Sequence, residues 1–471
     1  MSIVKAYVLP HPPLAVLASE QKQQIKATLS AFEKISAEIA AIAPETIIII
    51  TPHSVVYSDY FHISPGDSAS GSFARFGAPE TVVQADYNTD LAGEITRVSE
   101  ARGIPAGTLG EKDPDLDHGT TVPLWFINQA YADYKLVRIS QSAMEPAAHY
   151  RLGQAIAEAV ANVSTPKTVL IASGDLSHKL TDDGPYGFAK EGPEFDKHIV
   201  QALASGDFLS IFNTDDNLRE RAAECGYNSI MILAGTFDGK NVSSDLVSYE
   251  GPLGVGYAVS SFEPRDDDPS RNILAQYEEA ALERQKKLRQ SEDHYQALAR
   301  KSLEHIVQSE DILFGSAKHG GVLPVPENLP SEMINTQAGV FVSLHKNGRL
   351  RGCIGTIAPT TDNIAQEIIQ NAINAGLKDS RFDPVTADEL PLLTYKVDVL
   401  SAPESIPDAS FLDVLRYGVI VASSAGQRGL LLPNLDGVDT VEQQIAIAMQ
   451  KAGITSDTPV ELERFEVVRH G

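Results

Sequence analysis

The sequence predicts an α/β fold in which a mixed, mostly parallel sheet is sandwiched by helices and followed by a smaller C-terminal α+β domain. The first observation is segment 46–54, where four consecutive isoleucines lie between Pro44 and Pro52. Such a run is typical of a strand buried on both faces of a parallel sheet. The second is the alternation of strand-like and helix-like segments before residue 190. The third is a charged stretch at 263–270, bracketed by prolines, which indicates a domain boundary.

The N-terminal elements follow from apolar periodicity. Residues 3–9 form a strand-like run, and residues 18–43 repeat apolar side chains at helical spacing. With the isoleucine strand they predict a β-α-β unit with a right-handed crossover. Residues 57–88 show little periodicity and predict excursions around a site. The next expected elements are helices at 89–102 and 146–163 and strands at 135–140 and 167–172.

The later elements complete two domains. Residues 190–237 predict several helices, and the strand-like runs 245–250 and 254–260 predict antiparallel additions to the sheet. The C-terminal half predicts charged helices at 271–310, then strands at 339–344, 395–400 and 418–422 and helices at 361–375 and 441–452. We therefore expect an N-terminal domain at 1–262, an exposed linker at 263–272 and a C-terminal domain at 273–471.

Composition excludes several classes of protein. The 471 residues include 63 acidic and 38 basic side chains, a net charge of −25 that repels phosphate backbones and predicts no nucleic-acid partner. Apolar runs are too short to cross a bilayer, and the N-terminus lacks the pattern of a signal peptide, so we expect no membrane association and a cytoplasmic protein. The only two cysteines, Cys225 and Cys353, fall in different predicted domains and indicate no disulfide framework.

Histidines follow three of the predicted strands. His11 comes after the first strand, His53 after the isoleucine strand, and His178 after the strand at 168–172, in the segment Ser173–His178 that also contains Asp175. In open α/β sheets, ligands gather at the carboxyl ends of the strands. One such histidine is usually a loop residue, but three together favour a shared site.

Two further segments carry candidate site residues. His118 lies in Asp117-His118-Gly119, which alone reads as a turn, and Glu224 lies in a segment expected to be buried, where a carboxylate needs a partner or a metal. Two imidazoles and one carboxylate form a facial triad suited to Fe(II). His11, His53 and Glu224 can supply it, but the long gaps between them do not select these three over other combinations.

The motifs together resemble the class III extradiol ring-cleavage dioxygenase superfamily over residues 1–262. They are His11-Pro12-Pro13, Pro52-His53-Ser54, Asp117-His118-Gly119, Ser173-Gly174-Asp175-Leu176-Ser177-His178 and Glu224-Cys225-Gly226. The resemblance implies that His11, His53 and Glu224 hold non-haem Fe(II), that His178 is the acid/base residue, and that His118 assists with substrate and oxygen. It implies a catecholic or related small aromatic substrate and dioxygen as reactants.

Related Memo-like proteins leave alternatives open. Some of them place a cysteine near the third ligand position, and here Cys225 directly follows Glu224, so a thiolate ligand or a redox role competes with the carboxylate. Asp175 and Cys225 are therefore further candidate binding residues. The alternative function is a metal-binding protein without dioxygenase activity, in a small-molecule or protein-modification pathway. Zinc is the alternative metal. The sequence allows a homo-oligomer but does not determine the oligomeric state.

The C-terminal half resembles the AMMECR-like domain over residues 275–468. Three separate segments carry the resemblance: Leu350–Thr356, Lys378–Val385 and Gly429–Pro433. Within the first, Arg351 and Cys353 are candidate binding residues. Arg351 can lower the pKa of the Cys353 thiol or pair with Asp379 or Asp383. We favour a structural turn with a buried cysteine over a reactive thiol.

Overall fold

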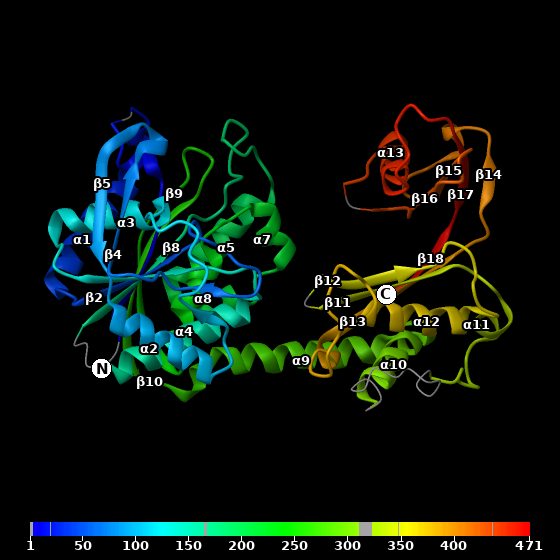
Figure 1. Ribbon diagram of the computed structural model, residues 1–471, viewed down its shortest axis with the longest axis horizontal. Coiled ribbons are helices and arrows are strands. Elements are labelled where there is room, and N and C mark those ends of the chain that lie inside the picture. Colours follow the sequence, from blue (N-terminus) through cyan, green and yellow to red (C-terminus); the bar gives the residue numbers. More distant parts are fainter. Residues whose placement is uncertain (1–2, 19, 164–166, 310–322, 347, 436) are drawn as a thin grey trace. The chain divides into compact units, whose positions relative to one another are not determined.

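The computed structural model describes residues 3–18, 20–163, 167–309, 323–346, 348–435 and 437–471, which form two compact units (Figure 1). The first unit spans Met1–Glu278 and the second Glu279–Gly471. Segment 263–272, which we expected to be an exposed linker, contains the end of β10 (Tyr257–Asp267) and a single helical turn (Pro269–Arg271), and α9 (Ile273–Ser291) begins directly after it. Charged residues and Pro264 are tolerated there because this part of β10 pairs only with β9.

A six-stranded sheet forms the centre of the first unit, in the order β7-β2-β8-β1-β10-β9. Strands β7, β2, β8 and β1 are parallel, whereas β10 and β9 join the sheet antiparallel. The predicted mixed, mostly parallel sheet is therefore confirmed. Besides β10, the strands are β1 (Ile3–Leu9), β2 (Thr46–Thr51), β7 (Lys135–Ser140), β8 (Thr168–Ser173) and β9 (Lys240–Glu250).

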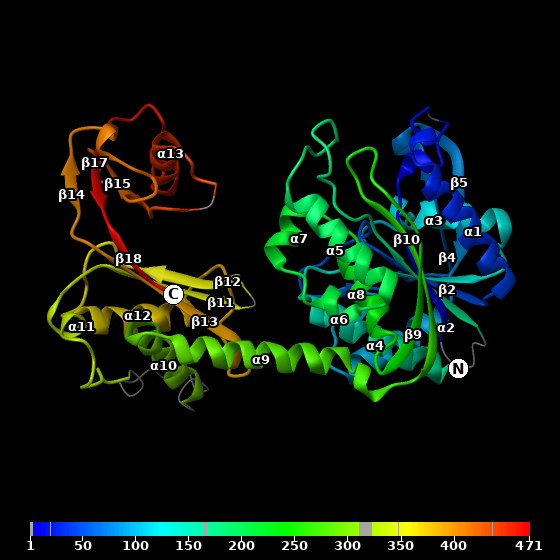
Figure 2. The same ribbon diagram turned by 180° about the vertical axis from the view of Figure 1, so that it is seen from behind.

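Helices cover both faces of this sheet, as Figures 1 and 2 show. One layer contains α1 and α3, and the other contains α2, α4, α5, α6 and α8. The helices are α1 (Lys26–Ile42), α2 (Thr89–Ala101), α3 (His118–Ala130), α4 (Pro146–Asn162), α5 (Glu191–Ser205), α6 (Phe208–Phe212), α7 (Asp216–Ala222) and α8 (Tyr227–Gly235).

The isoleucine strand β2 contributes to both apolar layers. All six of its residues are buried. Ile48 and Ile50 pack with the layer that contains α2 and α4, and Ile47 and Ile49 pack with α1 and α3. Alternation along the strand sends successive side chains to opposite faces, which explains why an uninterrupted apolar run is required here.

The aperiodic segment 57–88 contains short strands outside the main sheet. A hairpin pairs β4 (Ser68–Phe73) with β5 (Ala78–Asp86), with the single turn Ala74–Phe76 between them. β3 (Phe61–His62) pairs with β6 (Ala106–Gly107). The weak periodicity therefore reflects a partly exposed hairpin and one very short buried strand pair.

The second unit has two antiparallel four-stranded sheets, as expected of an α+β domain. Helices α10 and α12 pack on the sheet β12-β11-β13-β18, and α13 packs on the sheet β14-β17-β15-β16. The helices are α10 (His294–Gln308), α11 (Ser331–Asn335), α12 (Ile364–Leu377) and α13 (Val441–Lys451). The strands are β11 (Val340–Lys346), β12 (Arg349–Gly355), β13 (Leu393–Leu400), β14 (Glu404–Ile406), β15 (Gly418–Ser423), β16 (Arg428–Leu431), β17 (Val460–Phe465) and β18 (Val467–His470).

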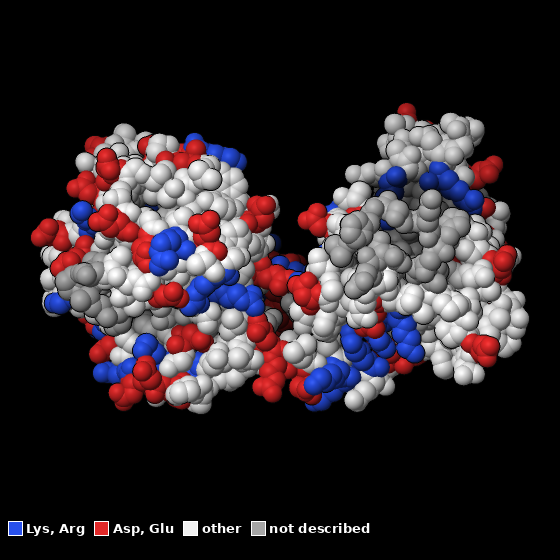
Figure 3. Space-filling view, turned by 60° about the horizontal axis from the view of Figure 1, so that its bottom comes forward, with Lys and Arg blue, Asp and Glu red and all other residues white. Residues whose placement is uncertain are grey.

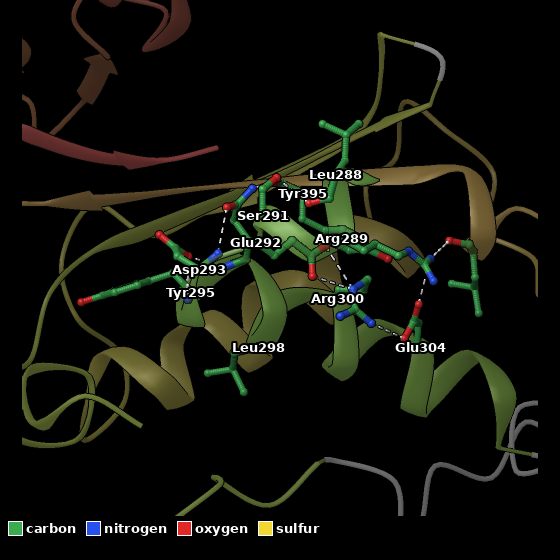
Figure 4. Close-up of polar contacts among 12 residues, drawn as sticks. Leu288, Arg289, Ser291, Glu292, Asp293, Tyr295, Leu298, Arg300, Glu304 and Tyr395 are labelled. Atoms are coloured by element: carbon green, nitrogen blue, oxygen red, sulfur yellow. Dashed lines mark hydrogen bonds and ion pairs between the residues drawn. The ribbon is translucent and has the colours of Figure 1, made fainter. Parts of the chain in front are cut away.

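Ion pairs join the end of α9 to α10 in this unit (Figure 4). Arg300 donates to Glu292 at 2.8 Å and to Glu304 at 3.0 Å, and Arg289 contacts Glu304 at 3.0 Å. The side chain of Asp293 accepts hydrogen bonds from the first turn of α10 as part of a capping box. The turn between the two helices is thereby held by charge pairs as well as by packing.

The surface carries both signs of charge. On the face shown in Figure 3, acidic and basic side chains are interspersed over the first unit, so the negative net charge is not gathered into one patch there. Within the described ranges, no helix has the length and apolar character needed to cross a membrane.

We predict that replacing Ile49 with Ala lowers the free energy of unfolding by about 2–5 kcal/mol, because the side chain is 0% exposed and the loss leaves a cavity. Urea unfolding of the full chain, followed by far-UV circular dichroism, measures this. The control Val82→Ala alters a side chain that is 56% exposed and should change the value by less than about 0.5 kcal/mol. Equal effects of the two changes would contradict the proposed role of β2.

Candidate metal centre

Three neighbouring parallel strands deliver the predicted histidines to one edge of the sheet. His11 follows β1, His53 follows β2, and His178 follows β8. These strands are adjacent in the sheet, so their carboxyl ends lie together. The sequence expectation of a shared site at this edge agrees with the arrangement of the residues.

Two histidine nitrogens and one sulfur converge at this edge. The Nε2 atoms of His11 and His53 lie 3.0 Å apart, and the Sγ atom of Cys225 lies 3.6 Å from Nε2 of His11. One nitrogen from each histidine and the sulfur all lie within 4.8 Å of one another. Asp175 and His178 form a second such group with the same sulfur. Four candidate residues from distant parts of the sequence are thus brought together around Cys225.

The orientation of His11 is fixed by a chain of hydrogen bonds. Ser173 Oγ donates its only hydrogen to the carbonyl oxygen of Gly119 at 2.6 Å, so it must accept from Nδ1 of His11 at 2.9 Å. His11 is therefore protonated at Nδ1, and its Nε2 lone pair points at the cluster. Metal-binding histidines are commonly oriented by such a bond from the other ring nitrogen.

The N-terminus of α3 holds His53 and His118. Asp117 is the N-cap of this helix and accepts from the Thr120 N–H at 3.2 Å and from Thr51 Oγ1 at 2.6 Å. Thr51 Oγ1 in turn accepts from the backbone N–H of His53 at 3.2 Å. The rings of His53 and His118 stack with centroids 4.1 Å apart. Asp117 thus bonds to the end of β2 and to its own helix.

A close backbone crossing places Cys225 in the cluster. A Cβ on Gly174 would lie 2.1 Å from the Cα of Gly226, so only glycine fits there. At this crossing the Asp175 N–H donates to Cys225 Sγ at 3.2 Å, and the Cys225 N–H donates to the Asp175 carbonyl at 3.3 Å. The segment before α8 is thereby tied to the end of β8.

The carboxylate of Glu224 contacts residues other than the candidate metal ligands. Its carboxylate lies 3.5 Å from Arg219 Nη2 and accepts from the Tyr227 N–H at 2.7 Å. Arg219 also lies over the Tyr227 ring, 3.6 Å from its centroid. Among the described residues, Glu224 belongs to neither of the two groups of candidate ligands. Its role as a metal ligand stays a prediction, while the structure brings Cys225 next to the histidines.

Desolvation keeps the imidazoles neutral. Burial, followed by the charges of His53, His118 and His178, lowers the pKa of His11 well below the usual value. Partial burial lowers the pKa of His178 to about 4, and desolvation also lowers the pKa values of His53 and His118. Burial raises the pKa of Asp175 to about 7 and that of the Cys225 thiol well above its usual value. Neutral imidazoles are ready to bind a metal, whereas the thiol must lose its proton on binding.

The donor set suits a transition-metal ion. Two imidazole nitrogens and one sulfur are ligands that Zn²⁺, iron and copper accept, whereas Mg²⁺ and Ca²⁺ prefer oxygen. A three-residue set leaves coordination positions for other ligands. The residues therefore fit a metal of this class.

Comparison with known proteins identifies the two halves of the chain. Residues 5–260 match the family described as the catalytic LigB subunit of aromatic ring-opening dioxygenase. The chain belongs to the LigB family. Residues 296–470 match the AMMECR1 family. The resemblances inferred from the sequence motifs are confirmed at this level.

Some relatives match this chain over its whole length, and others match only a part of it. Protein CA_C1420 of Clostridium acetobutylicum is 41% identical over 480 residues, covering 100% of this chain and 99% of its own. A Thermotoga maritima protein is 51% identical over 155 residues, which cover 32% of this chain and 88% of that protein. The domain pair thus occurs together in the clostridial relative.

Similar solved structures cover parts of this chain. Protein JW3007 from Escherichia coli K12 is 16% identical with a TM-score of 0.39, covering 55% of this chain and 99% of its own. Protein PH0010 from Pyrococcus horikoshii is 27% identical with a TM-score of 0.32, covering 37% and 88%.

The candidate residues of the AMMECR1 domain are engaged in local contacts. Arg351 binds Glu389 through two hydrogen bonds of 2.9 Å, and its Nη1 donates to the backbone carbonyl of Asp383. Asp379 pairs with Arg381 and accepts from the Cys353 N–H at 2.9 Å. The structural turn with a buried cysteine that we favoured is wrong, because Arg351 and Cys353 lie in strand β12, paired with β11, and Cys353 is only half-buried. Of the two partners considered for Arg351, Asp383 is contacted through its backbone carbonyl, whereas the Asp379 carboxylate pairs with Arg381. Binding roles for Arg351 and Cys353 stay predictions.

Sequence reasoning missed the residues that orient the ligands. Ser173 and Thr51 end their strands as small hydroxyl residues in otherwise apolar runs, which is the one signal that pointed to them. Arg138 carries a similar signal, since a charged residue interrupts the apolar strand 135–140. None of these contacts follows from spacing along the chain.

We predict that Cys225→Ala lowers metal affinity by more than about 100-fold, the upper range for loss of a residue that merely supports a ligand. Glu224→Gln should keep the affinity within about threefold, because glutamine still accepts from the Tyr227 N–H. Competition with a chelating dye, using Zn²⁺ and anaerobic Fe²⁺, measures both variants. A large loss in Glu224→Gln with little change in Cys225→Ala would restore Glu224 as the ligand.

We predict that stability of the metal-free protein depends on the protonation of His11. Its folded pKa lies well below the value of about 6.5 expected in the unfolded chain, so below pH 6.5 the unfolded state binds the extra proton. This group's contribution to stability is complete above pH 6.5 and falls as the pH drops, by up to about 1.4 kcal/mol per pH unit. Urea unfolding at pH 7, 6 and 5 with EDTA should show a shallower fall for His11→Asn than for the parent chain. Parallel pH profiles would contradict this.

Proposed function

We propose that the LigB domain is a metal-dependent dioxygenase that opens a catecholic or related small aromatic ring. The observation that carries the proposal is the convergence of His11 Nε2, His53 Nε2 and Cys225 Sγ at the carboxyl ends of parallel strands. Catalytic sites of open α/β sheets lie at this edge. Membership of the LigB family supports the same reaction class.

His11, His53 and Cys225 would hold the metal, which we propose to be Fe(II), with Zn as the alternative. When bound, Fe(II) would supply the redox chemistry that couples oxidation of a diol to reduction of dioxygen. The protein contributes rigidity, because His11 is fixed by Ser173 and the segment of Cys225 is fixed by the Asp175 backbone. Holding two reactants in one orientation removes much of the entropic barrier to reaction.

His178 and His118 would act as the acid/base groups of the reaction. His178 shares a group of candidate ligands with Asp175 and Cys225, and its lowered pKa leaves a ring nitrogen free to accept a phenolic proton. His118 stacks on His53 and lies edge-on to the ring of His11. Tyr186 stacks on His178 at 5.1 Å and Phe76 contacts His118 at 5.5 Å, so aromatic rings flank both groups. Such rings suit a planar substrate.

A second candidate function is metal binding without ring cleavage. The specific observation in its favour is that the third converging donor is a cysteine sulfur, while the nearest glutamate in sequence is paired with Arg219. The Fe(II) triad of oxygenases has a carboxylate in that place. A thiolate donor is common in stable zinc sites.

We predict that anaerobically purified full-length protein loaded with Fe²⁺ consumes one dioxygen per catechol and yields a ring-opened product. Oxygen uptake against a panel of catechols, with product absorbance, measures this. His178→Gln should reduce turnover by about 10²–10⁴-fold with unchanged iron content, because it removes the proton acceptor. The matched control is His198→Gln, which changes a histidine bonded to Ser210 and Thr214 instead. Tightly held zinc with no oxygen uptake on any catechol would favour the second candidate.

A further inference from the structure

Arg138 is a fully buried cation beneath the candidate metal centre. It lies on β7, and its side chain is 0% exposed. Its Nε donates to Ser64 Oγ at 2.6 Å, and its Nη1 donates to the carbonyl oxygen of Asp115 at 2.7 Å. Burying a guanidinium is costly unless charges and hydrogen bonds compensate it. The carboxylates that compensate the charge of Arg138 therefore indicate its structural role.

Two carboxylates from one loop face this guanidinium. Glu111 lies 3.5 Å from Nη2 and Asp117 lies 3.7 Å from Nη1. With the bond to Asp115, these contacts tie the segment 111–117 to the central sheet. This segment leads directly into α3, so the position of the helix start depends on the same cation.

Asp117 connects the segment held by Arg138 to His53 and His118. One oxygen of Asp117 accepts from Thr51 Oγ1, which accepts the backbone N–H of His53. The same carboxylate caps the helix whose first residue is His118. Asp117 is only 10% exposed, so without a cation nearby its charge would be poorly compensated.

We infer that Arg138 is a positioning residue of the metal centre, acting through Asp117 on His53 and His118. In the part of the chain that the structure describes, its guanidinium contacts Ser64 and the segment 111–117 rather than the candidate ligands. It holds Asp117 where that carboxylate reaches both the end of β2 and the first turn of α3. The inference deepens the proposed function and rests on it, since the site it serves is the proposed metal centre.

The first test needs no metal. In full-length protein with ¹³Cε1-labelled histidines, Arg138→Met should shift the ring resonances of His53 and His118 and leave those of His178 and His198 in place. Arg138→Lys keeps the charge and should give smaller shifts. The matched control is Arg300→Met, which removes a partly buried arginine with two carboxylate partners in the other unit. Unmoved His53 and His118 resonances, or equal shifts throughout the LigB domain, would overturn the inference.

The second test asks whether Asp117 transmits the effect. Co²⁺ affinity, measured from its absorption bands, should fall about tenfold in Arg138→Met relative to the parent chain. Adding Arg138→Met to the Asp117→Asn variant should lower the affinity of that variant by less than about twofold. The cysteine-to-cobalt absorption should persist, because Cys225 is held by a different segment. Additive losses in the double variant would overturn transmission through Asp117. Failure of the parent chain to bind Co²⁺ would overturn the metal centre itself, and the histidine resonances separate that result from failure of the positioning role.

Discussion

The hydrogen-bonded start of α3 is the constraint on which the candidate site depends. Within three consecutive residues, Asp117 bonds to Thr51, His118 stacks on His53, and the carbonyl of Gly119 accepts from Ser173. Through Thr51 and Ser173, this helix end is linked to both His53 and His11. A rigid network of satisfied buried polar groups gives one arrangement of the ring nitrogens rather than several. The candidate ligands His11 and His53 are thereby held in place by the protein itself.

The third donor depends on a different constraint. Gly174 and Gly226 cross with no room for a Cβ, and this contact carries Cys225 toward the end of β8. Glu224, one residue earlier, is drawn instead to Arg219 and the start of α8. Neighbouring residues in such a turn point in different directions, so a shift of one position exchanges a carboxylate for a sulfur. That exchange alters the metal preference of the site.

Family membership and site chemistry answer separate questions. The LigB match identifies the family to which residues 5–260 belong. It does not by itself fix the activity, because related folds support different chemistries when the side chains of the site change. The AMMECR1 domain is a second example. In it, Arg351 pairs with Glu389 and Arg381 pairs with Asp379. There the motif identifies a fold in which polar side chains make local contacts around strand β12.

The sequence alone determined the α/β class, the two-part chain and the edge at which the histidines gather. These features follow from local patterns, because an isoleucine run, an amphipathic helix and a histidine after a strand are all visible along the chain. Only the tertiary structure decided between Glu224 and Cys225 as the neighbour of His11 and His53, and revealed Arg138 behind Asp117. Those choices depend on side-chain direction and on contacts between segments tens to hundreds of residues apart, which spacing in the sequence does not encode.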